Sequence, residues 1–255
     1  MTTSEDSLLK LQETIYFSSN YTRRRLHQIR LRWVSAAIKA YAPQIPISRA
    51  IEYGPGSGIY LGVLAEDCAD VIGADIEPAY LSGIERLLDK FENLQILVDD
   101  IQESKLEDAS FGLVLCTEVL EHVPSPELAL HTLYRILRPG GILILTTPQR
   151  FSFMELFSKI AFLPGVIQLV RQIYREPILE MGHISLRTAT ELRTSIADCG
   201  FEFLSEDKFG LYLPFLAEFG GAWGGRRIAT IERLIKSSPL NWVLWTQAYI
   251  LRKPI

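Results

Sequence analysis

The stretch Ile51-Glu52-Tyr53-Gly54-Pro55-Gly56-Ser57-Gly58 decides the fold of this chain. An apolar run at 50–53 leads into its glycines, and a helical pattern at 58–66 follows them. Glycines let a turn pass close to a ligand without an obstructing Cβ, and such a turn presents backbone N–H groups near a helix N-terminus. A tight turn without any ligand is the plainer alternative. The stretch therefore predicts a strand, a turn and a helix that can hold a ligand.

Short apolar runs alternate with helical patterns from Ile47 to Pro148. We predict strands at 50–53, 71–74, 94–98, 111–116 and 142–146. We predict helices at 58–66, 78–90, 118–122 and 126–137. Because this alternation is typical of right-handed βαβ units, it predicts an α/β fold with a parallel sheet covered by helices on both faces.

The alternation stops after Pro148, where residues 149–185 are irregular and apolar. The remaining predicted elements are helices at 21–41 and 188–199 and strands at 201–207 and 242–251. The expected organisation is a helical lid at 1–44 and a main domain at 45–255 with cap insertions at about 149–185 and 209–240. Such caps would cover the carboxyl ends of the strands, where open α/β sheets bind ligands.

Aspartates follow the second and third predicted strands. Asp75 comes 21 residues after Gly54, where a carboxylate can accept hydrogen bonds from both ribose hydroxyls of an adenosine. Asp99-Asp100-Ile101 follows the third strand and offers an acceptor and an apolar contact to an adenine. Together with the glycine turn, these residues predict an adenosine site.

The glycine turn departs from two common nucleotide motifs. No P-loop signature occurs, and a dinucleotide fingerprint needs a third glycine at the position of Ile59, whereas Gly58 comes one residue early. Glu52 would repel a pyrophosphate but suits the ammonium group of a methionine. The charge therefore favours a sulfonium amino-acid nucleoside over NAD, although an NAD-dependent oxidoreductase stays open as the alternative enzyme.

The ordered set of motifs resembles the class I S-adenosylmethionine-dependent methyltransferases, and within them the type 11 group that includes quinone-biosynthesis enzymes. The run 52–58 resembles the first motif of that family, and Asp75 resembles its ribose-binding acid. Asp99-Asp100-Ile101 resembles its adenine motif. Residues 111–123 are similar to its fourth-strand signature, although Gly112 stands where the family usually has aspartate.

Two later segments extend the resemblance, namely 137–143, which is similar to the approach to the fifth strand, and Gly182-His183-Ile184. The resemblance implies a Rossmann-like, doubly wound sheet of seven strands, mostly parallel, with an antiparallel last strand. It implies S-adenosylmethionine as the cofactor and the chain as a methyltransferase. The implied cofactor-binding residues are Glu52, Gly54, Pro55, Gly56, Gly58, Asp75, Ile76, Asp99, Asp100, Ile101, Cys116 and Thr117.

Two histidines are candidate catalytic bases for a hydroxyl acceptor. Imidazole titrates near neutral pH, so His122 and His183 could each remove a proton from the acceptor. A structural or cofactor-shaping role is the plainer alternative for His122. His27 and His131 are expected on outer helix faces, away from any site.

Glu118, Glu121 and His122 are expected on one face of the helix predicted at 118–122. Such a trio can bind a divalent cation, and the resemblance includes quinone O-methyltransferases that do so. Many relatives with similar residues bind none, and we expect no metal here.

The acceptor is constrained by the caps and by the predicted helix at 21–41. The arginines of this helix are expected to form a solvated basic face, with attraction to an anionic substrate or membrane surface as the alternative. The two insertions are aromatic, through Phe151, Phe153, Phe157, Phe162, Phe215, Phe219 and Trp223. Such residues more often pack a cap core than hold a ligand. They would also suit a small, hydrophobic or lipid-linked acceptor with O-methylation favoured, and peripheral contact with a membrane.

Composition limits the remaining options. The net charge of −4 and a pI near 5.7 argue against a nucleic-acid binder. Cys68, Cys116 and Cys199 are too far apart for a disulfide framework or zinc site, and this indicates a cytoplasmic protein. The apolar segments at 209–224 and 239–251 are expected to be exposed and could form a dimer interface, which leaves monomer and homodimer open. A catalytically silent cofactor-binding scaffold is the second alternative function, because fold does not dictate chemistry.

Overall fold

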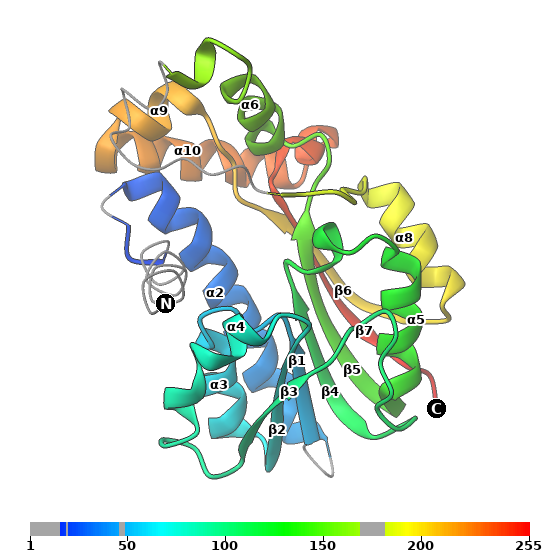
Figure 1. Ribbon diagram of the computed structural model, residues 1–255. Helices are drawn as coiled ribbons and strands as arrows, with labels where there is room; N and C mark the ends of the chain where they lie inside the picture. Colours follow the sequence, from blue (N-terminus) through cyan, green and yellow to red (C-terminus); the bar gives the residue numbers. More distant parts are fainter. Residues whose placement is uncertain (1–15, 19, 46–48, 169–181) are drawn as a thin grey trace.

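A seven-stranded sheet forms the centre of the chain (Figure 1). The computed structural model describes residues 16–18, 20–45, 49–168 and 182–255. The strands are β1 (Arg49–Tyr53), β2 (Asp70–Asp75), β3 (Leu94–Val98), β4 (Phe111–Thr117), β5 (Leu137–Pro148), β6 (Glu202–Phe209) and β7 (Thr246–Arg252). Their spatial order is β3-β2-β1-β4-β5-β7-β6.

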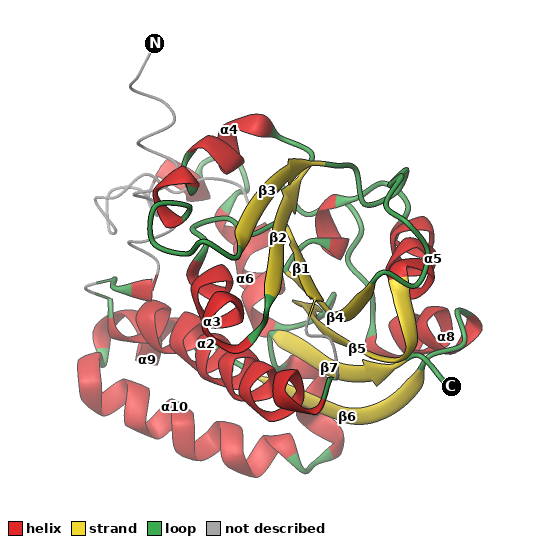
Figure 2. Cartoon of the chain, turned by 90° about the horizontal axis from the view of Figure 1, so that it is seen from below, coloured by secondary structure: helices red, strands yellow, loops and turns green. Residues whose placement is uncertain are grey.

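Helices cover both faces of this sheet (Figures 1 and 2). On one face lie α2 (Tyr21–Tyr41) and α3 (Ile59–Asp67), and on the other α5 (Pro126–Ile136) and α8 (Ala189–Asp198). Successive residues of the buried strands point to opposite faces, so Val114 packs with the α5 side and Leu115 with the α2 side. Each face therefore has its own apolar core.

Three further helices lie beyond one end of the sheet because of the direction of the strands. β1 to β5 are parallel, whereas β7 is antiparallel to both β5 and β6, so β6 runs in the same direction as β5. α6 (Phe153–Ala161) follows β5, and α9 (Pro214–Phe219) and α10 (Gly221–Lys236) follow β6. All three helices consequently lie beyond the carboxyl ends of the parallel strands (Figure 1).

The prediction of a mostly parallel sheet of seven strands with an antiparallel last strand is confirmed. The helix predicted at 78–90 is instead divided into α4 (Pro78–Ser82) and a 3₁₀ turn, η2 (Glu85–Leu87), with Gly83 as the C-cap of α4. The fifth strand begins at Leu137 rather than at 142, because Phe111 already pairs with Leu137.

The last strand begins at Thr246, since residues Pro239–Val243 form a 3₁₀ helix, η4. β7 is buried between β5 and β6, so most of the apolar segment at 239–251 is not an exposed surface, contrary to expectation. The insertion at 149–185 is not wholly irregular, because it contains α6, whose N-cap Ser152 accepts a hydrogen bond from the backbone N–H of Glu155. Residues 169–181 of this insertion lie outside the described residues.

The helix predicted at 21–41 is confirmed as α2, but two expectations for its surface are wrong. Arg30 is buried rather than solvated, and His27 packs between the rings of Tyr16 and Trp245, with both centroid distances 5.6 Å. Near the N-terminus of α2, Arg25 forms a 2.7 Å ion pair with Glu232 of α10. α2 thus joins the sheet to the cap helices. In the described part of the chain, no helix has the length and apolar character needed to span a bilayer.

Candidate functional site

A cavity of about 420 Å³ lies at the carboxyl ends of β1, β2, β3 and β4. This volume is within the usual range for small-molecule sites. Eight of the residues predicted for the site line it, namely Gly54, Gly56, Asp75, Ile76, Asp99, Asp100, Ile101 and His122. The structure therefore brings the glycine turn and both aspartate motifs to one place.

Gly54 and Gly58 have backbone conformations that favour glycine, with φ of +66° and +72°. A Cβ on Gly54 would lie 2.4 Å from Cγ2 of Val119, which follows β4 and also lines the cavity. Gly58 is the N-cap of α3 and lies outside the lining, as does Pro55. The turn can therefore approach both a ligand and the β4 segment only because Gly54 carries no side chain.

Each aspartate of the cavity is held by a neighbour. Asp75 Oδ1 accepts a 2.9 Å hydrogen bond from the backbone N–H of Glu77, and Asp100 Oδ1 accepts one of 2.8 Å from that of Gln102. Asp99 Oδ2 accepts a 2.8 Å bond from the hydroxyl of Tyr53. Partial burial raises the pKa of Asp75, although its backbone hydrogen bonds act in the opposite direction. These contacts orient the carboxylates before any ligand arrives.

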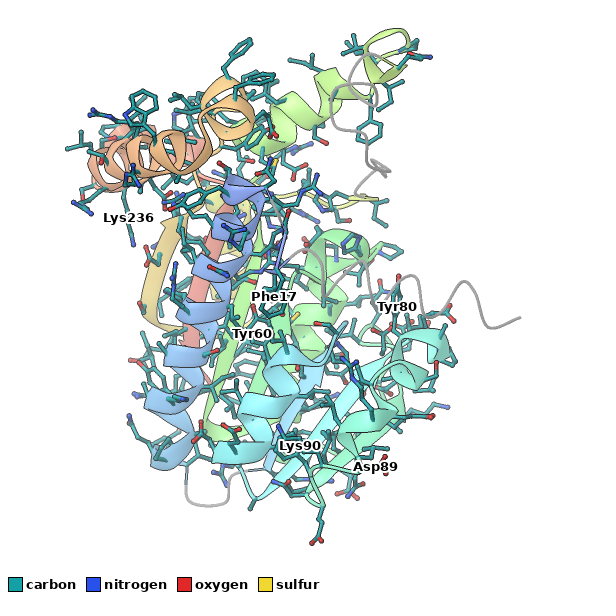
Figure 3. The ribbon with its side chains drawn as sticks, turned by 90° about the vertical axis from the view of Figure 1, so that its left-hand side faces the viewer. Phe17, Tyr60, Tyr80, Asp89, Lys90 and Lys236 are labelled. Carbon is teal, nitrogen blue, oxygen red and sulfur yellow. The ribbon has the colours of Figure 1, made fainter. Side chains whose placement is uncertain are left out.

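Apolar side chains flank the same carboxylates. Ile76 lines the cavity with 62% of its surface exposed, and Ile101 lines it from the buried side. Tyr80 of α4 completes the lining on this side, and Figure 3 labels it at the end of the molecule that carries α4. A planar apolar group such as a purine could be placed against these residues, with Asp75 and Asp99 at its polar edges.

Glu52 belongs to β1, two residues before Gly54 of the cavity lining, and it is fully buried. In the described part of the structure, neither of its carboxylate oxygens has a hydrogen-bond partner. Burial raises the pKa of this carboxyl well above its usual value. Because an unpartnered buried carboxylate is unfavourable, a cationic ligand group near Glu52 would relieve a cost that the protein bears alone.

Cys116 and Thr117 end β4 beside Glu52, and both are buried rather than part of the cavity wall. Burial, with the nearby carboxyl groups of Glu121 and Glu52, raises the pKa of the Cys116 thiol above its usual range. These two residues could support the floor of the site.

Glu118 has an unusual backbone conformation at the end of β4, with a φ of +57°. Its N–H donates to the carbonyl of Thr146 at 2.9 Å, and its carboxylate accepts a 3.0 Å bond from the Thr146 hydroxyl. This conformation ends the strand without starting a helix, so the helix predicted at 118–122 is reduced to a 3₁₀ turn, η3 (Leu120–His122). The predicted common helix face of Glu118, Glu121 and His122 is therefore wrong.

Arg30 of α2 binds Glu118 directly, with its Nη1 2.7 Å from Oε2. Burial acts to lower the pKa of Arg30, but Glu118 and the nearby Tyr16 and Tyr60 raise it above its usual value. Tyr60 belongs to α3, and Figure 3 labels it near α2. The guanidinium therefore stays charged and fixes one wall of the cavity to the N-terminal helix.

His122 and His183 lie next to each other, with ring centroids 5.2 Å apart. His122 lines the cavity, and its Nδ1 is 3.3 Å from the carbonyl oxygen of Gly182. Burial and the neighbouring His183 lower the pKa of His122. His183 lies behind His122, outside the lining, so the structure brings the two predicted catalytic histidines together at one end of the cavity.

Glu155 holds His183 in place and was missed by the sequence prediction. His183 Nδ1 is 3.2 Å from Glu155 Oε2, while the indole N–H of Trp245 donates to Glu155 Oε1 at 3.2 Å. All three residues are largely buried. Glu155 comes from α6 and Trp245 from the residue before β7, so no local pattern in the sequence could have paired them with His183.

Glu121, His122 and His183 could together hold a metal ion, because one ligand atom from each lies within 4.8 Å of the others. Glu121 is buried, and its Oε2 accepts a 3.0 Å hydrogen bond from the hydroxyl of Thr147. Burial and the nearby Glu118 raise the pKa of Glu121 well above its usual value. Glu118, the third member of the predicted trio, is bound to Arg30 instead.

Several cavity residues lie outside the predicted set, namely Tyr53, Ala74, Glu77, Tyr80, Gln102, Glu118, Val119, Val123 and Pro124. Tyr53 stands inside the glycine motif, and Gln102 directly follows the adenine-type motif, so proximity to a motif was an available signal for both. Tyr80 is on the second-strand side, one helical turn beyond Glu77. Val123 ends the segment 111–123 that resembles the fourth-strand signature, whereas no signal marked Pro124.

Residues 51–145 match a family model described as "Methyltransferase domain". A protein of Mycolicibacterium smegmatis named "Probable S-adenosylmethionine-dependent methyltransferase" is 28% identical over 191 residues, which are 74% of this chain and 65% of that protein. A ubiquinone biosynthesis O-methyltransferase of Xanthomonas oryzae pv. oryzae is 32% identical over 130 residues, which are 49% of this chain and 51% of that protein. The chain thus spans about two-thirds and half of these relatives' lengths.

Solved structures share the fold at low sequence identity. An S-adenosylmethionine-dependent methyltransferase from Mesorhizobium loti has a TM-score of 0.58 and 15% identity, covering 85% of this chain and 96% of that one. The cyclase SpnF has the same TM-score of 0.58 with 16% identity, covering 87% of this chain and 80% of that one. Proteins with different chemistry therefore use this architecture.

Proposed function

We infer that this chain transfers a methyl group from S-adenosylmethionine to a small acceptor, and the match of residues 51–145 to a methyltransferase domain supports this inference. The observation that carries the proposal is Glu52, whose buried carboxylate has no partner among the described residues. An amino-acid ammonium group would supply that partner. A pyrophosphate would place negative charge against it.

The residues of the cavity fit S-adenosylmethionine. Asp75 would accept the ribose hydroxyls, and Ile76 and Ile101 would contact the adenine together with Asp99 and Asp100. Gly54 and Gly56 would let the backbone approach the methionine portion of the cofactor. The buried carboxylate of Glu52 would form an ion pair with the ammonium group of that portion. Pro55, Gly58, Cys116 and Thr117 would shape the turn and the floor rather than touch the cofactor.

When bound, S-adenosylmethionine supplies an activated methyl group on a sulfonium. The chain's task is then to align the acceptor with that methyl group and to exclude water. Glu118 is fixed by Arg30 at the cavity wall and would help to define this alignment. The cap helices at the same edge of the sheet would keep water away.

We place the base for a hydroxyl acceptor at the histidine pair. Glu155 would hold His183 in one ring orientation, and His122 at the cavity wall would lie between it and the acceptor. A base can contribute about 10²–10⁴-fold to such a reaction. O-methylation is accordingly the favoured reaction, and its acceptor would be small and apolar or lipid-linked, in keeping with the apolar cap helices. A lipid-linked acceptor would be reached through peripheral contact with a membrane.

We predict that Glu155→Gln lowers kcat about tenfold for a hydroxyl acceptor, since the base contribution depends on how His183 is oriented. The dissociation constant for S-adenosylmethionine should stay unchanged, because Glu155 does not line the cavity. Steady-state kinetics and calorimetry on the same preparation measure both quantities. An unchanged kcat would mean that Glu155 only supports the fold.

We predict that cofactor binding strengthens as the pH rises. Burial raises the pKa of free Glu52, so the carboxyl holds a proton at pH values where glutamate is normally ionised. An ammonium group favours the ionised form, so binding must release that proton below the raised pKa and becomes easier as the pH increases. Calorimetry in two buffers with different ionisation enthalpies counts the protons released.

Glu52→Gln is the matched control, because it keeps the shape of the side chain and removes the titration. The variant should bind S-adenosylmethionine more weakly and release no proton. If the affinity of the wild type for S-adenosylmethionine does not change with pH below the raised pKa of Glu52, then Glu52 does not bind the ammonium group.

The expectation that no metal is required stays a prediction, although Glu121, His122 and His183 lie close enough to share an ion. We expect EDTA treatment to leave cofactor binding unchanged and methyl transfer intact, because the carboxylate of Glu118 is engaged by Arg30 and, among the residues that the structure describes, only three ligand atoms converge. Activity that is lost in EDTA and restored by Mg²⁺ or Zn²⁺ would contradict this.

The proposal is tested by calorimetry with S-adenosylmethionine and S-adenosylhomocysteine, followed by release of S-adenosylhomocysteine in the presence of candidate acceptors. Micromolar cofactor binding with turnover would support the methyltransferase. Binding without turnover on any acceptor would favour a silent scaffold, an alternative kept by the fold shared with a cyclase. A fluorescence titration with NADH tests the oxidoreductase alternative, and strong NADH binding would replace the proposal.

Placement in the cytoplasm is part of the proposal. It is supported by Cys68, Cys116 and Cys199, which are buried as free thiols in the structure. The oligomeric state is proposed to be a monomer or a homodimer, and the net charge of −4 opposes a nucleic-acid partner.

A further inference from the structure

Exposed aromatic side chains project from α9 and the start of α10. Phe215, Phe219 and Trp223 are exposed by 82%, 72% and 54%. Phe215 and Phe219 are four residues apart, so they share one face of α9. Such rings are normally buried in a protein that has no partner for them.

This exposure is not the result of loose packing, because the opposite face of the two helices is held tightly. A Cβ on Gly224 would lie 2.2 Å from the carbonyl oxygen of Leu216, and one on Gly225 would lie 1.9 Å from Tyr21 of α2. Ala217 and Ile228 are buried in the small core between these helices. The helices therefore have a fixed inner face and a fixed aromatic outer face.

α6 also exposes apolar side chains, but its inner face includes a carboxylate. Its one buried carboxylate, Glu155, points inward to His183 and Trp245, whereas Leu156 and Ile160 are exposed by 48% and 44%. The ring of Phe157 packs against Tyr212, just before α9, at a centroid distance of 6.4 Å. α6, α9 and α10 thus lie near one another beyond the carboxyl ends of the parallel strands (Figure 1), and we define the cap surface as their exposed side chains Leu156, Ile160, Phe215, Phe219, Trp223, Arg226 and Arg227.

The cap surface also carries cationic side chains, and a further one lies beside it. Arg226, Arg227 and Arg233 are exposed on α10, and among the described residues no carboxylate forms an ion pair with any of them. Arg227 lies over the ring of Trp223 at 5.3 Å. The net charge of the whole chain is −4, so these exposed arginines contrast with a chain that is acidic as a whole.

The two carboxylates of the same segment are turned inward and satisfied. Glu218 accepts hydrogen bonds from Asn20 at 2.7 Å and Tyr212 at 2.8 Å. Glu232 binds Arg25 at 2.7 Å and accepts from the backbone N–H of Gly210. A second copy of this surface would therefore meet the arginines with arginines, and its carboxylates would not be available to neutralise them.

We propose that the cap surface docks on an anionic lipid bilayer, with Phe215, Phe219 and Trp223 inserted at the headgroup level and Arg226 and Arg227 against lipid phosphates. Aromatic rings and arginines are the side chains suited to that boundary, where the ring is in an apolar layer and the guanidinium meets anionic headgroups. The inference extends the proposed function, because it states where an apolar acceptor would be met. The docking itself does not depend on methyl transfer.

The test is co-sedimentation of the full chain with vesicles of phosphatidylcholine alone or with roughly one-third phosphatidylglycerol. Wild type should bind the anionic vesicles, and added NaCl should weaken that binding. The double variant Phe215→Ser/Phe219→Ser should bind at least tenfold more weakly, because it removes the inserted rings. Arg226→Gln/Arg227→Gln should lose about thirtyfold, at roughly fivefold for each arginine near an anionic surface.

Leu128→Ser is the matched control, since Leu128 is 52% exposed but lies on α5, on the far side of the sheet from α2. It should bind vesicles like the wild type. Thermal unfolding of each variant tests whether these substitutions of exposed residues leave the fold intact.

Absence of wild-type binding to both vesicle types would overturn the proposal, as would equal binding by all variants. Equal binding to neutral vesicles would overturn the choice of an anionic surface. Dimers that dissociate in Phe215→Ser/Phe219→Ser, with no vesicle binding, would make this face an interface between copies instead. Cofactor calorimetry on the same samples separates failure of docking from failure of the proposed function.

Discussion

Asp75→Ala is expected to weaken S-adenosylmethionine binding by about 100-fold or more. A carboxylate that accepts hydrogen bonds from two ribose hydroxyls makes two charge-assisted bonds, each contributing about 1.5–3 kcal/mol. Asp75 is already oriented by the N–H of Glu77, so little order must be gained on binding. Calorimetry with S-adenosylmethionine and with S-adenosylhomocysteine measures the loss, which should be similar for both because they share the ribose.

Asp70→Ala is a suitable control for Asp75→Ala, because both residues belong to β2 and lie at its opposite ends. Asp70 pairs with Arg49 at 2.8 Å in a half-exposed ion pair, whose loss should cost at most about 1 kcal/mol of stability. It should leave cofactor affinity unchanged. Equal affinities of wild type and Asp75→Ala would show that the ribose is held elsewhere.

Arg30→Met is expected to lower the free energy of unfolding by about 3 kcal/mol, because it leaves the carboxylate of Glu118, whose side chain is only 17% exposed, without its cation. For a chain of 255 residues this corresponds to a fall in Tm of roughly 10 °C. Urea unfolding monitored by tryptophan fluorescence and by circular dichroism measures the change. The cofactor should also bind more weakly, since Glu118 lines the cavity.

The double variant Arg30→Met/Glu118→Gln shows whether the lost charge or the lost packing causes the effect. Removing both charges should restore most of the stability, because the variant no longer buries an unpaired carboxylate. If the double variant is as unstable as Arg30→Met, the arginine acts through packing, for example against the ring of Trp245 at 5.7 Å.

Local sequence patterns were sufficient wherever the structure depends on neighbours in the chain. The helix at 21–41 and the strand at 94–98 were predicted with the bounds that the structure has. The aspartates and Gly54 also come together as expected, because parallel strands place their carboxyl ends at one edge. The periodicity and the motif spacing contain this information.

The departures have a common physical cause, which is contact between residues far apart in the sequence. Glu118 reads as helical, but its N–H is taken by Thr146 of β5, and the chain adopts a positive φ. Arg30 reads as a surface residue of a basic helix, but Glu118 buries it. Neither partner is visible in a local window of sequence.

Glu155 shows the same limit for the candidate site. Its position near the start of an apolar helix predicts at most a favourable charge in the first turn. Its pairing with His183 and Trp245 depends on how α6 packs beside the start of β7. The burial of Glu155 is visible only once the packing of α6 is known.

The position of β7 between β5 and β6 has a consequence for how the protein is made. β6 has β7 as its partner in the sheet, so residues 202–209 have no strand neighbour until residues 246–252 have left the ribosome. During that interval the growing chain presents the free edges of both β5 and β6, and such edges are templates for pairing between chains. Nascent chains released before residue 246 should therefore be captured by chaperones or degraded, even though every residue that lines the cavity has already been synthesised.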